Sequence, residues 1–200
     1  QPGSSFKPFI YSASLEKGLS PGTVINDAPI TFDASQTGSQ AREPKNYDNK
    51  YEGPMSMRKG LSKSKNMISI RILEKIGPQY AQEYVTRFGF DPEKNPPYLT
   101  LALGAGAVTP LQLASSIGGL SIGGKWFQPH LVKLAAEPEP QRVGKWDPLN
   151  VAKVVSGMYG VVNEGGTGTA AAIPGVTVSG KTGSAQRISN ELVKSNAALA

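Results

Sequence analysis

Four serines in this chain each precede a lysine by three positions, a spacing that can pair a nucleophile with its base. Residues three apart share one face of a helix, with Cβ atoms ~5–6 Å apart. A neutral lysine amine in that place could accept the proton of the serine hydroxyl. The lysine must then titrate below its usual pKa of ~10.4, which requires burial or a nearby cation. The four pairs are Ser4/Lys7, Ser14/Lys17, Ser56/Lys59 and Ser62/Lys65.

The surrounding residues favour the first pair. Ser4 follows a Pro-Gly dipeptide and opens a predicted helix, so its N–H and hydroxyl lie at the positive end of the helix dipole. Phe6, Phe9 and Ile10 can bury that helix and remove water from Lys7. The second pair falls at a helix end, and the other two lie among charged residues, as on a solvated face. Taken alone, the pair is better explained by an ordinary N-cap serine.

Other sequence matches to nucleophile or cofactor motifs lack the context that their chemistry needs. Residues 119–123 match the G-x-S-x-G elbow, but they follow a predicted helix, and no acidic residue lies between Ser121 and His130. Residues 166–171 match a dinucleotide fingerprint but also follow a helix, so a flexible loop is expected there. His130 is the chain's one histidine, and we expect a structural or surface role for it. A nucleophile in this chain therefore needs a base other than histidine.

The composition indicates one folded domain of 200 residues, with 38% hydrophobic residues and a net charge of +6. The basic excess suits an anionic partner, but a soluble basic surface is the explanation that we favour. With no cysteine and one histidine, a zinc site is not expected. No apolar run approaches the ~18–20 residues that span a bilayer, and no signal peptide opens the chain. The character of both chain ends suggests a fragment of a longer protein.

Helices are predicted through most of the chain and strands near its C-terminal end, which places it in the α+β class. Residues 19–54 are rich in turn-forming residues and are expected to be loop with short strands, and 165–168 are expected to be a loop. The predicted helices span residues 4–17, 54–63, 67–76, 78–88, 109–122 and 147–162, and the predicted strands span 126–135 and 176–188.

Two further motifs follow the first pair in a fixed order. Ser64-Lys65-Asn66 lies between two predicted helices, 57 residues after Lys7, and Lys181-Thr182-Gly183 lies in the late strand. Each tripeptide is weak evidence alone. Together they form the S-x-x-K, S-x-N and K-T-G set of serine enzymes that recognise penicillin.

With these motifs the chain resembles the penicillin-binding proteins over nearly its whole length. Residues 1–9 are similar to the nucleophile segment of that family, and residues 64–73 to its second motif. Residues 101–111 resemble the bifunctional, class A members. Residues 158–167 and 180–186 look more like a monofunctional, class B elongation enzyme. The two halves therefore point to different subclasses.

The resemblance implies a role for each matching residue. Ser4 would be the nucleophile and Lys7 its base. Ser64 would relay a proton to the leaving amine, and Asn66 would hold the substrate amide. Lys181 would supply a positive charge, and Thr182 a hydroxyl, to bind the substrate carboxylate. Gly183 would let the substrate backbone approach the strand. The N–H groups of Ser4 and Ser184 would form an oxyanion hole.

The resemblance also implies a function. The chain would be a D,D-transpeptidase that cross-links peptidoglycan stem peptides and is acylated by β-lactam antibiotics, without a cofactor and without nucleic acid as a partner. The alternatives are a β-lactamase-type hydrolase and a non-enzymatic β-lactam sensor. The parent protein would lie in the periplasm or on the outer face of the cytoplasmic membrane, held by an anchor outside this chain.

The fold implied is that of the β-lactamases and D,D-peptidases, with a helical subdomain. Residues 1–200 would form a partial transpeptidase domain whose antiparallel sheet is incomplete, because the family's flanking strands and terminal helix lie outside the chain. The K-T-G strand would then be an exposed edge. We therefore expect the isolated 200-residue piece to aggregate, or to bind penicillin far more slowly than the complete domain.

Overall fold

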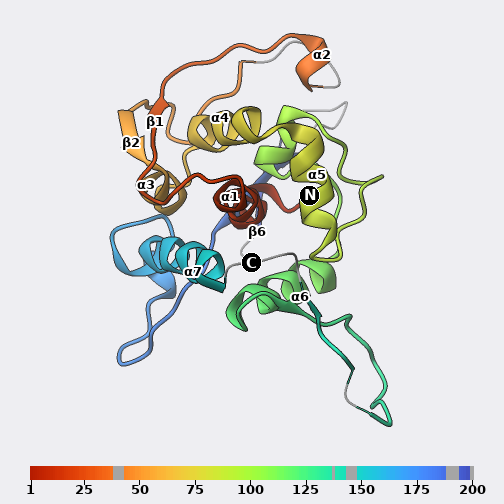
Figure 1. Cartoon of the computed structure of the whole chain (residues 1–200). Coiled ribbons are helices and arrows are strands. Elements are labelled where there is room, and N and C mark those ends of the chain that lie inside the picture. Colours follow the sequence, from red (N-terminus) through yellow and green to blue (C-terminus); the bar gives the residue numbers. More distant parts are fainter. Residues whose placement is uncertain (38–42, 137, 143–147, 188–193, 199–200) are drawn as a thin grey trace.

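The computed structural model describes residues 1–37, 43–136, 138–142, 148–187 and 194–198 of the chain (Figure 1). Within these residues helices surround one central helix, and the strands form three two-stranded sheets, so the α+β class is confirmed. None of the described helices has both the length and the apolar character needed to cross a membrane. The elements, in chain order, are η1 (Gly3–Phe6), α1 (Lys7–Glu16), β1 (Val24–Asp27), α2 (Ala34–Thr37), β2 (Gly53–Ser56), α3 (Met57–Ser62), α4 (Asn66–Ile76), α5 (Pro78–Thr86), η2 (Leu99–Leu103), α6 (Pro110–Ser121), β3 (Lys125–Trp126), β4 (Gln141–Arg142), α7 (Pro148–Asn163), η3 (Thr169–Ala171), β5 (Gly183–Arg187) and β6 (Lys194–Ala198).

Helix α1 lies at the centre of the molecule, with α4, α5 and α7 packed around it (Figure 1). Every residue from Lys7 to Leu15 is buried. Phe9 packs edge-on against Phe88 and Phe90, with ring centroids 4.9 Å apart in both pairs, a geometry that stabilises aromatic clusters beyond their burial. The helix predicted over residues 4–17 is confirmed, except that its first turn is a 3₁₀-helix. The apolar surroundings fix Lys7 inside the protein.

The segment between α1 and α4 forms a hairpin and a short helix. Strands β1 and β2 pair antiparallel, with Val24 opposite Ser56 and Asp27 opposite Gly53. The helix predicted over residues 54–63 is therefore correct only from Met57 onward. Ser56 is extended, and its hydroxyl accepts a hydrogen bond from the Lys59 N–H, so it caps α3 instead of belonging to it.

The remaining helices lie close to their predicted positions. Gly77, with φ +90°, separates α4 from α5, a conformation that glycine adopts without a Cβ penalty. At α6 the predicted cap is present: the Thr109 hydroxyl accepts from the Gln112 N–H, and the Gln112 side chain accepts from the Thr109 N–H. Helix α7 begins at Pro148, whereas Asp147, its predicted cap, lies outside the described residues.

The K-T-G strand differs from its prediction in length and in pairing. Strand β5 begins at Gly183, not at residue 176, because the chain before it makes only an isolated bridge between Ile173 and Val176. Its expected last residue, Ile188, lies outside the described residues. Strand β5 pairs antiparallel with β6 over five residues, from Gly183 opposite Ala198 to Arg187 opposite Lys194. The prediction that no later strand covers this one was therefore wrong: one edge of β5 is paired.

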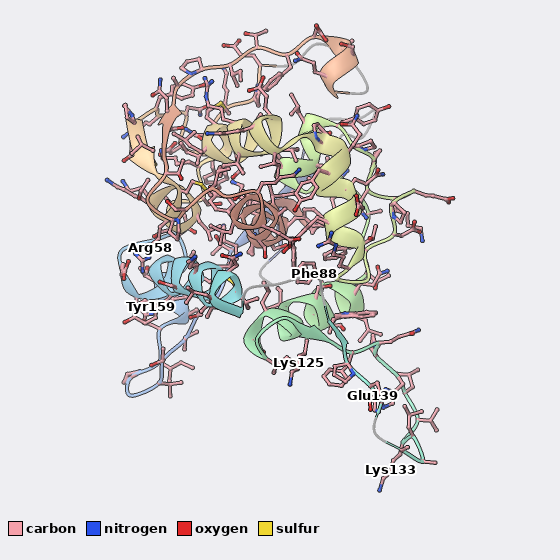
Figure 2. The ribbon with its side chains drawn as sticks, viewed as in Figure 1. Arg58, Phe88, Lys125, Lys133, Glu139 and Tyr159 are labelled. Carbon is pink, nitrogen blue, oxygen red and sulfur yellow. The ribbon has the colours of Figure 1, made fainter. Side chains whose placement is uncertain are left out.

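The strand predicted over residues 126–135 is also wrong. Strand β3 ends at Trp126, and the chain then runs out from the body as an irregular arm that carries Lys133 (Figure 2). The apolar residues of the run 130–134 suggested a strand here, but Leu131 is 97% exposed and Val132 is 74% exposed. These side chains have no surface to pack against, and strand formation depends on such packing.

Candidate active site

Lys7 joins the first motif to the second. It is the first residue of α1, and its side chain is completely buried. Its Nζ donates to the Ser64 carbonyl oxygen at 2.7 Å, to Asn66 Oδ1 at 2.8 Å and to Ser64 Oγ at 3.3 Å. A buried ammonium or amine needs such acceptors. The central helix thus places a lysine directly on the turn between α3 and α4.

Lys181 joins the third motif to the second. Only 5% of this residue is exposed, and its Nζ donates to Ser64 Oγ at 2.7 Å and to the Thr182 carbonyl oxygen at 3.1 Å. The Ser64 hydroxyl therefore accepts hydrogen bonds from two lysines that come from opposite ends of the chain. A hydroxyl so placed can pass a proton from one amine to a neighbouring group.

The electrostatics of the site lower the pKa of both lysine amines. Burial lowers the pKa of Lys7 well below its usual value, and the charge of Lys181 lowers it further, while Asp27 acts in the opposite direction. Burial also lowers the pKa of Lys181 to about 7. A lysine that loses its proton near neutral pH can act as a general base.

The turn that carries Ser64 is held in an unusual backbone conformation. Ser64 has φ +55°, in the left-handed region that costs a non-glycine residue about 1–3 kcal/mol. Hydrogen bonds on both sides hold it there: Ser64 N–H donates to the Leu61 carbonyl oxygen and Lys65 N–H to that of Gly60. This conformation directs the Ser64 hydroxyl toward the two lysines. Strain of this kind persists where surrounding contacts over-determine it.

Ser4 lies against the start of the K-T-G strand. It is partly buried in η1, and within the described residues Lys7 donates no hydrogen bond to it. A Cβ built on Gly3 would lie 2.1 Å from the Ser184 carbonyl oxygen, and one on Gly183 would lie 3.0 Å from the Pro2 carbonyl oxygen. Glycine on both sides therefore allows η1 and β5 to meet backbone to backbone.

A loop after α7 completes this side of the site. The Thr167 and Thr182 hydroxyl oxygens are 2.7 Å apart, and the Thr167 N–H donates to the Ser62 carbonyl oxygen at 3.2 Å. Arg58, which lies beside α7 in Figure 2, donates to Glu164 Oε1 at 2.9 Å and ties the loop to α3. The loop expected at residues 165–168 is thus present, but its backbone is anchored.

The structure brings most of the predicted residues together. Lys7, Ser64, Asn66 and Lys181 form one hydrogen-bonded network, and residues 182–184 continue from it along β5 toward η1. Ser4 lies where η1 meets β5, outside the hydrogen bonds of that network.

The sequence interpretation missed two residues that contact the site. Thr167 contacts the Thr182 hydroxyl, and Asn46 Oδ1 accepts a hydrogen bond from the Asn66 N–H at 2.8 Å. Both lie in segments rich in turn residues, which predicted only loop. No sequence signal separated them from their neighbours.

The competing serines have other partners. Ser14 Oγ donates to the Tyr11 carbonyl oxygen, and Ser121, at the end of α6, donates to that of Gly118. The expectation that Ser62 and Lys65 lie on a solvated face was wrong: both are buried, and Ser62 Oγ donates to the Gly160 carbonyl oxygen. The local sequence is basic, but the Lys65 side chain is only 3% exposed because it pairs with Asp27, Asp48 and Glu52, which come earlier in the chain. His130 is exposed, as expected.

Comparison with known proteins agrees with this arrangement. The family model of the penicillin binding protein transpeptidase domain matches residues 1–198. The chain belongs to this family. Penicillin-binding protein 1A of Neisseria flavescens is 42% identical over 196 residues, which cover 92% of this chain and 25% of that protein. Penicillin-binding protein 1A of Pseudomonas aeruginosa is 39% identical over 151 residues, covering 76% of this chain and 18% of that protein. The chain thus spans about a quarter or less of the length of these relatives.

Solved structures of the family share the fold. The crystal structure of penicillin-binding protein 1A from Haemophilus influenzae has a TM-score of 0.81 and 29% identity, covering 92% of this chain and 34% of that one. Penicillin-binding protein A from M. tuberculosis, solved as an imipenem acyl-enzyme complex, has a TM-score of 0.78 at 23% identity, covering 93% and 48%. The second likeness concerns the fold alone. The predicted β-lactamase/D,D-peptidase fold is confirmed.

Proposed function

We propose that this chain is the catalytic part of a peptidoglycan D,D-transpeptidase, with Ser4 as its nucleophile. The observation that carries the proposal is the Ser64 hydroxyl, which accepts hydrogen bonds from Lys7 and Lys181 at 3.3 and 2.7 Å. A buried amine of lowered pKa can serve as the base for a serine nucleophile, and a hydroxyl beside it can relay the proton to a leaving group.

In the first half-reaction the Ser4 Oγ attacks the carbonyl carbon between two D-alanines of a stem peptide. The Lys7 amine takes the hydroxyl proton as the new O–C bond forms. Ser64 passes that proton from Lys7 to the departing nitrogen as the C–N bond breaks. D-alanine leaves, and the peptide remains as an ester on Ser4.

In the second half-reaction an amine of a neighbouring stem peptide attacks the ester carbon. Lys7 receives the proton of that amine, the ester C–O bond breaks, and Ser4 regains its proton. The new peptide bond is the cross-link. A β-lactam enters by the first step, with its ring amide in place of the D-Ala-D-Ala bond.

The other site residues bind and orient the substrate. The N–H groups of Ser4 and Ser184 form the oxyanion hole, and the close backbone contact of η1 with β5 supports this assignment. Removing one donor of this kind typically costs ~2.7–4 kcal/mol of transition-state stabilisation. Asn66 binds the substrate amide, and Gly183 lets its backbone approach β5. Lys181 and Thr182 bind the terminal carboxylate, and Thr167 orients the Thr182 hydroxyl that it contacts.

The partners of the chain are peptidoglycan stem peptides and β-lactam antibiotics. The imipenem acyl-enzyme of M. tuberculosis penicillin-binding protein A supports acylation of this chain by the same class of compound. The substrate lies outside the cytoplasm, so the chain works in the periplasm or on the outer face of the cytoplasmic membrane. Residues 1–200 act as part of the transpeptidase domain of a longer, membrane-anchored protein.

The test is covalent labelling of the complete transpeptidase domain that contains this chain with a fluorescent penicillin, followed by mass spectrometry of the modified peptide. Labelling at Ser4, its loss in Ser4→Ala and its retention in Ser14→Ala are the expected results. Label at another serine contradicts the assignment of the nucleophile. The rate of label release then separates the alternatives, since rapid hydrolysis indicates a β-lactamase. A stable acyl-enzyme that never transfers a stem peptide to an amine indicates a sensor.

A further inference from the structure

Lys65, the residue between Ser64 and Asn66, points away from the site and into a group of carboxylates. Its side chain is only 3% exposed. The Nζ atom lies 3.1 Å from Glu52 Oε1, 3.2 Å from Asp48 Oδ2 and 3.6 Å from Asp27 Oδ2. Burying an ammonium costs several kcal/mol unless it is paired, so these contacts hold the Lys65 side chain in one place.

Asp27 is the innermost member of this group. Its carboxylate is completely buried at the end of β1. Oδ1 accepts from Asn46 Nδ2 at 2.7 Å, and Oδ2 accepts from the Glu52 N–H at 3.0 Å. The carboxylate is thus fully engaged by neutral donors as well as by Lys65. Removing its partner would leave an uncompensated buried charge.

Asn46 links Asp27 to the proposed active site. While its Nδ2 donates to Asp27, its Oδ1 accepts from the Asn66 N–H at 2.8 Å. The Asn66 side chain is held as well, because its Nδ2 donates to the Lys45 carbonyl oxygen at 2.7 Å and its Oδ1 accepts from Lys7 at 2.8 Å. A continuous path of direct contacts therefore runs from Asp27 through Asn46 and Asn66 to Lys7.

A buried ion pair contributes little net stability compared with apolar residues of the same volume. The contacts that link the Asp27–Lys65 pair to Asn66 suggest that it has a positioning role instead. Lys65 and Asn66 follow Ser64, whose left-handed φ of +55° requires support from its neighbours. The anchored Lys65 side chain and the Asn46–Asn66 hydrogen bond supply that support on the C-terminal side of the turn.

We propose that Asp27, Asn46 and Lys65 form a positioning network that holds the Ser64–Asn66 turn in its reactive arrangement and balances the charge felt by Lys7. None of the three touches the reacting atoms, so they act through Ser64, Asn66 and Lys7. The proposal rests on the proposed function, since it assigns Lys7 the part of the base.

The electrostatics support this role. Burial and the charge of Lys181 lower the pKa of Lys7, and the Asp27 carboxylate opposes them. Burial would also lower the pKa of Lys65, but hydrogen bonds to Glu52 and Asp48 and the charge of Asp27 raise it overall, so Lys65 stays charged. The charged groups that act on Lys7 are Lys181, before β5, and Asp27, and the groups that face Asp27 also include Tyr11 of α1 and Lys65 before α4. Asp48 and Glu52, which lie between β1 and β2, contact Lys65.

Charge-removing variants at the two ends of the buried pair should shift Lys7 in opposite directions. Asp27→Asn removes the charge that favours protonated Lys7, so its titration should move to lower pH. Lys65→Met removes a cation and leaves Asp27 uncompensated, so the titration should move to higher pH. In the double variant Asp27→Asn/Lys65→Met the titration of Lys7 should return toward that of the unsubstituted protein, because both charges are gone.

Two readouts are measured in the folded protein. The first is the titration of Lys7, followed by NMR of ¹³Cε-labelled lysine and assigned with a Lys7→Gln variant. The second is the pH dependence of acylation by a fluorescent penicillin, whose acid limb should shift with Lys7. Lys65→Met should also acylate about 10- to 100-fold more slowly on its pH plateau, a usual effect of displacing a catalytic group by about an ångström.

The matched control is Lys63→Met. Lys63 also pairs with Glu52, at 2.6 Å, but its side chain is 37% exposed and it lies outside the network. This variant should leave both readouts unchanged. Lys65→Arg keeps the charge, so its Lys7 titration and acylation rate should be closer to those of the unsubstituted protein than the values for Lys65→Met.

Two results would overturn the inference. One is that Lys7 titrates in the folded single variants as it does in the unsubstituted protein, and the other is that both single variants shift the titration of Lys7 in the same direction. Failure of the proposed function has a different signature. In that case the unsubstituted protein is not acylated at Ser4 at all. The Lys7 titration in the variants still decides whether the network balances the charge of Lys7.

Discussion

Lys181 Nζ lies 2.7 Å from Ser64 Oγ, although 117 residues separate the two in the chain. Lys7 Nζ lies 3.3 Å from the same oxygen. One hydroxyl therefore connects the three motifs. Because burial lowers the pKa of both lysines, the group of three can hold and move a proton.

Removal of the Ser64 hydroxyl should disable acylation without unfolding the protein. For Ser64→Ala we expect the acylation rate to fall about 10²- to 10⁴-fold, the usual contribution of positioned proton transfer. Ser64→Gly is the matched control, because glycine relieves the left-handed strain of about 1 kcal/mol while also lacking the hydroxyl. The glycine variant should be the more stable of the two in urea and equally slow. Recovery of acylation in Ser64→Gly would show that backbone strain, not the hydroxyl, is what matters.

Lys7 and Lys181 should respond differently to arginine. Lys7→Arg keeps a positive charge but cannot lose its proton, so acylation should collapse. Lys181→Arg keeps the charge proposed to bind a carboxylate and should retain far more activity. Stopped-flow acylation with a β-lactam, together with thermal melts to verify folding, makes the comparison. Equal losses in two folded variants would refute this division of roles.

The stability of the protein should increase with pH above neutrality. Lys181 titrates at about 7 in the folded state and at its ordinary value of 10.5 when unfolded, so between these values the unfolded chain binds more protons. The free energy of unfolding therefore rises from pH 7 toward pH 10. Below pH 7 both states hold the proton, and this contribution no longer changes. Lys7 acts in the same direction.

Urea unfolding across this pH range tests the effect. Lys181→Met should reduce the slope of stability against pH without abolishing it, since Lys7 still contributes. Lys59→Met, at an exposed position, is the control and should leave the slope intact. An unchanged slope in Lys181→Met would mean that Lys181 titrates alike in both states.

Gly3→Ala should separate η1 from β5. Its φ of +57° alone penalises alanine, and the new Cβ would meet the Ser184 carbonyl oxygen at 2.1 Å. Gly18→Ala is a matched control, because Gly18 has φ +88° and a Cβ added there would have no neighbour within 4 Å. In both variants the free energy of unfolding should fall by about 1–2 kcal/mol, because alanine is unfavourable at a positive φ. Only Gly3→Ala should also lose acylation, measured with fluorescent penicillin, since only this contact bears on the proposed oxyanion hole.

Much of the local structure follows directly from the sequence. The apolar spacing around Phe6, Phe9 and Ile10 predicted a buried helix that carries Lys7, and Thr109-Pro110 predicted the start of α6. These elements depend on neighbours in the chain, which caps and helical periodicity report. The order of the three motifs likewise indicated the family and the residues that meet at Ser64.

Tertiary contacts decided the rest. The apolar run within residues 126–135 suggested a strand but lacks a surface to pack on, and β5 is paired by β6, which the sequence pattern did not predict. Lys65 was taken for a surface residue because a run of charges resembles a solvated face. Its partners Asp27, Asp48 and Glu52 lie 13 to 38 residues away in the chain and come together only when the β1–β2 hairpin folds against α4. A one-dimensional pattern records which charges exist, whereas burial and pairing depend on contacts between distant segments.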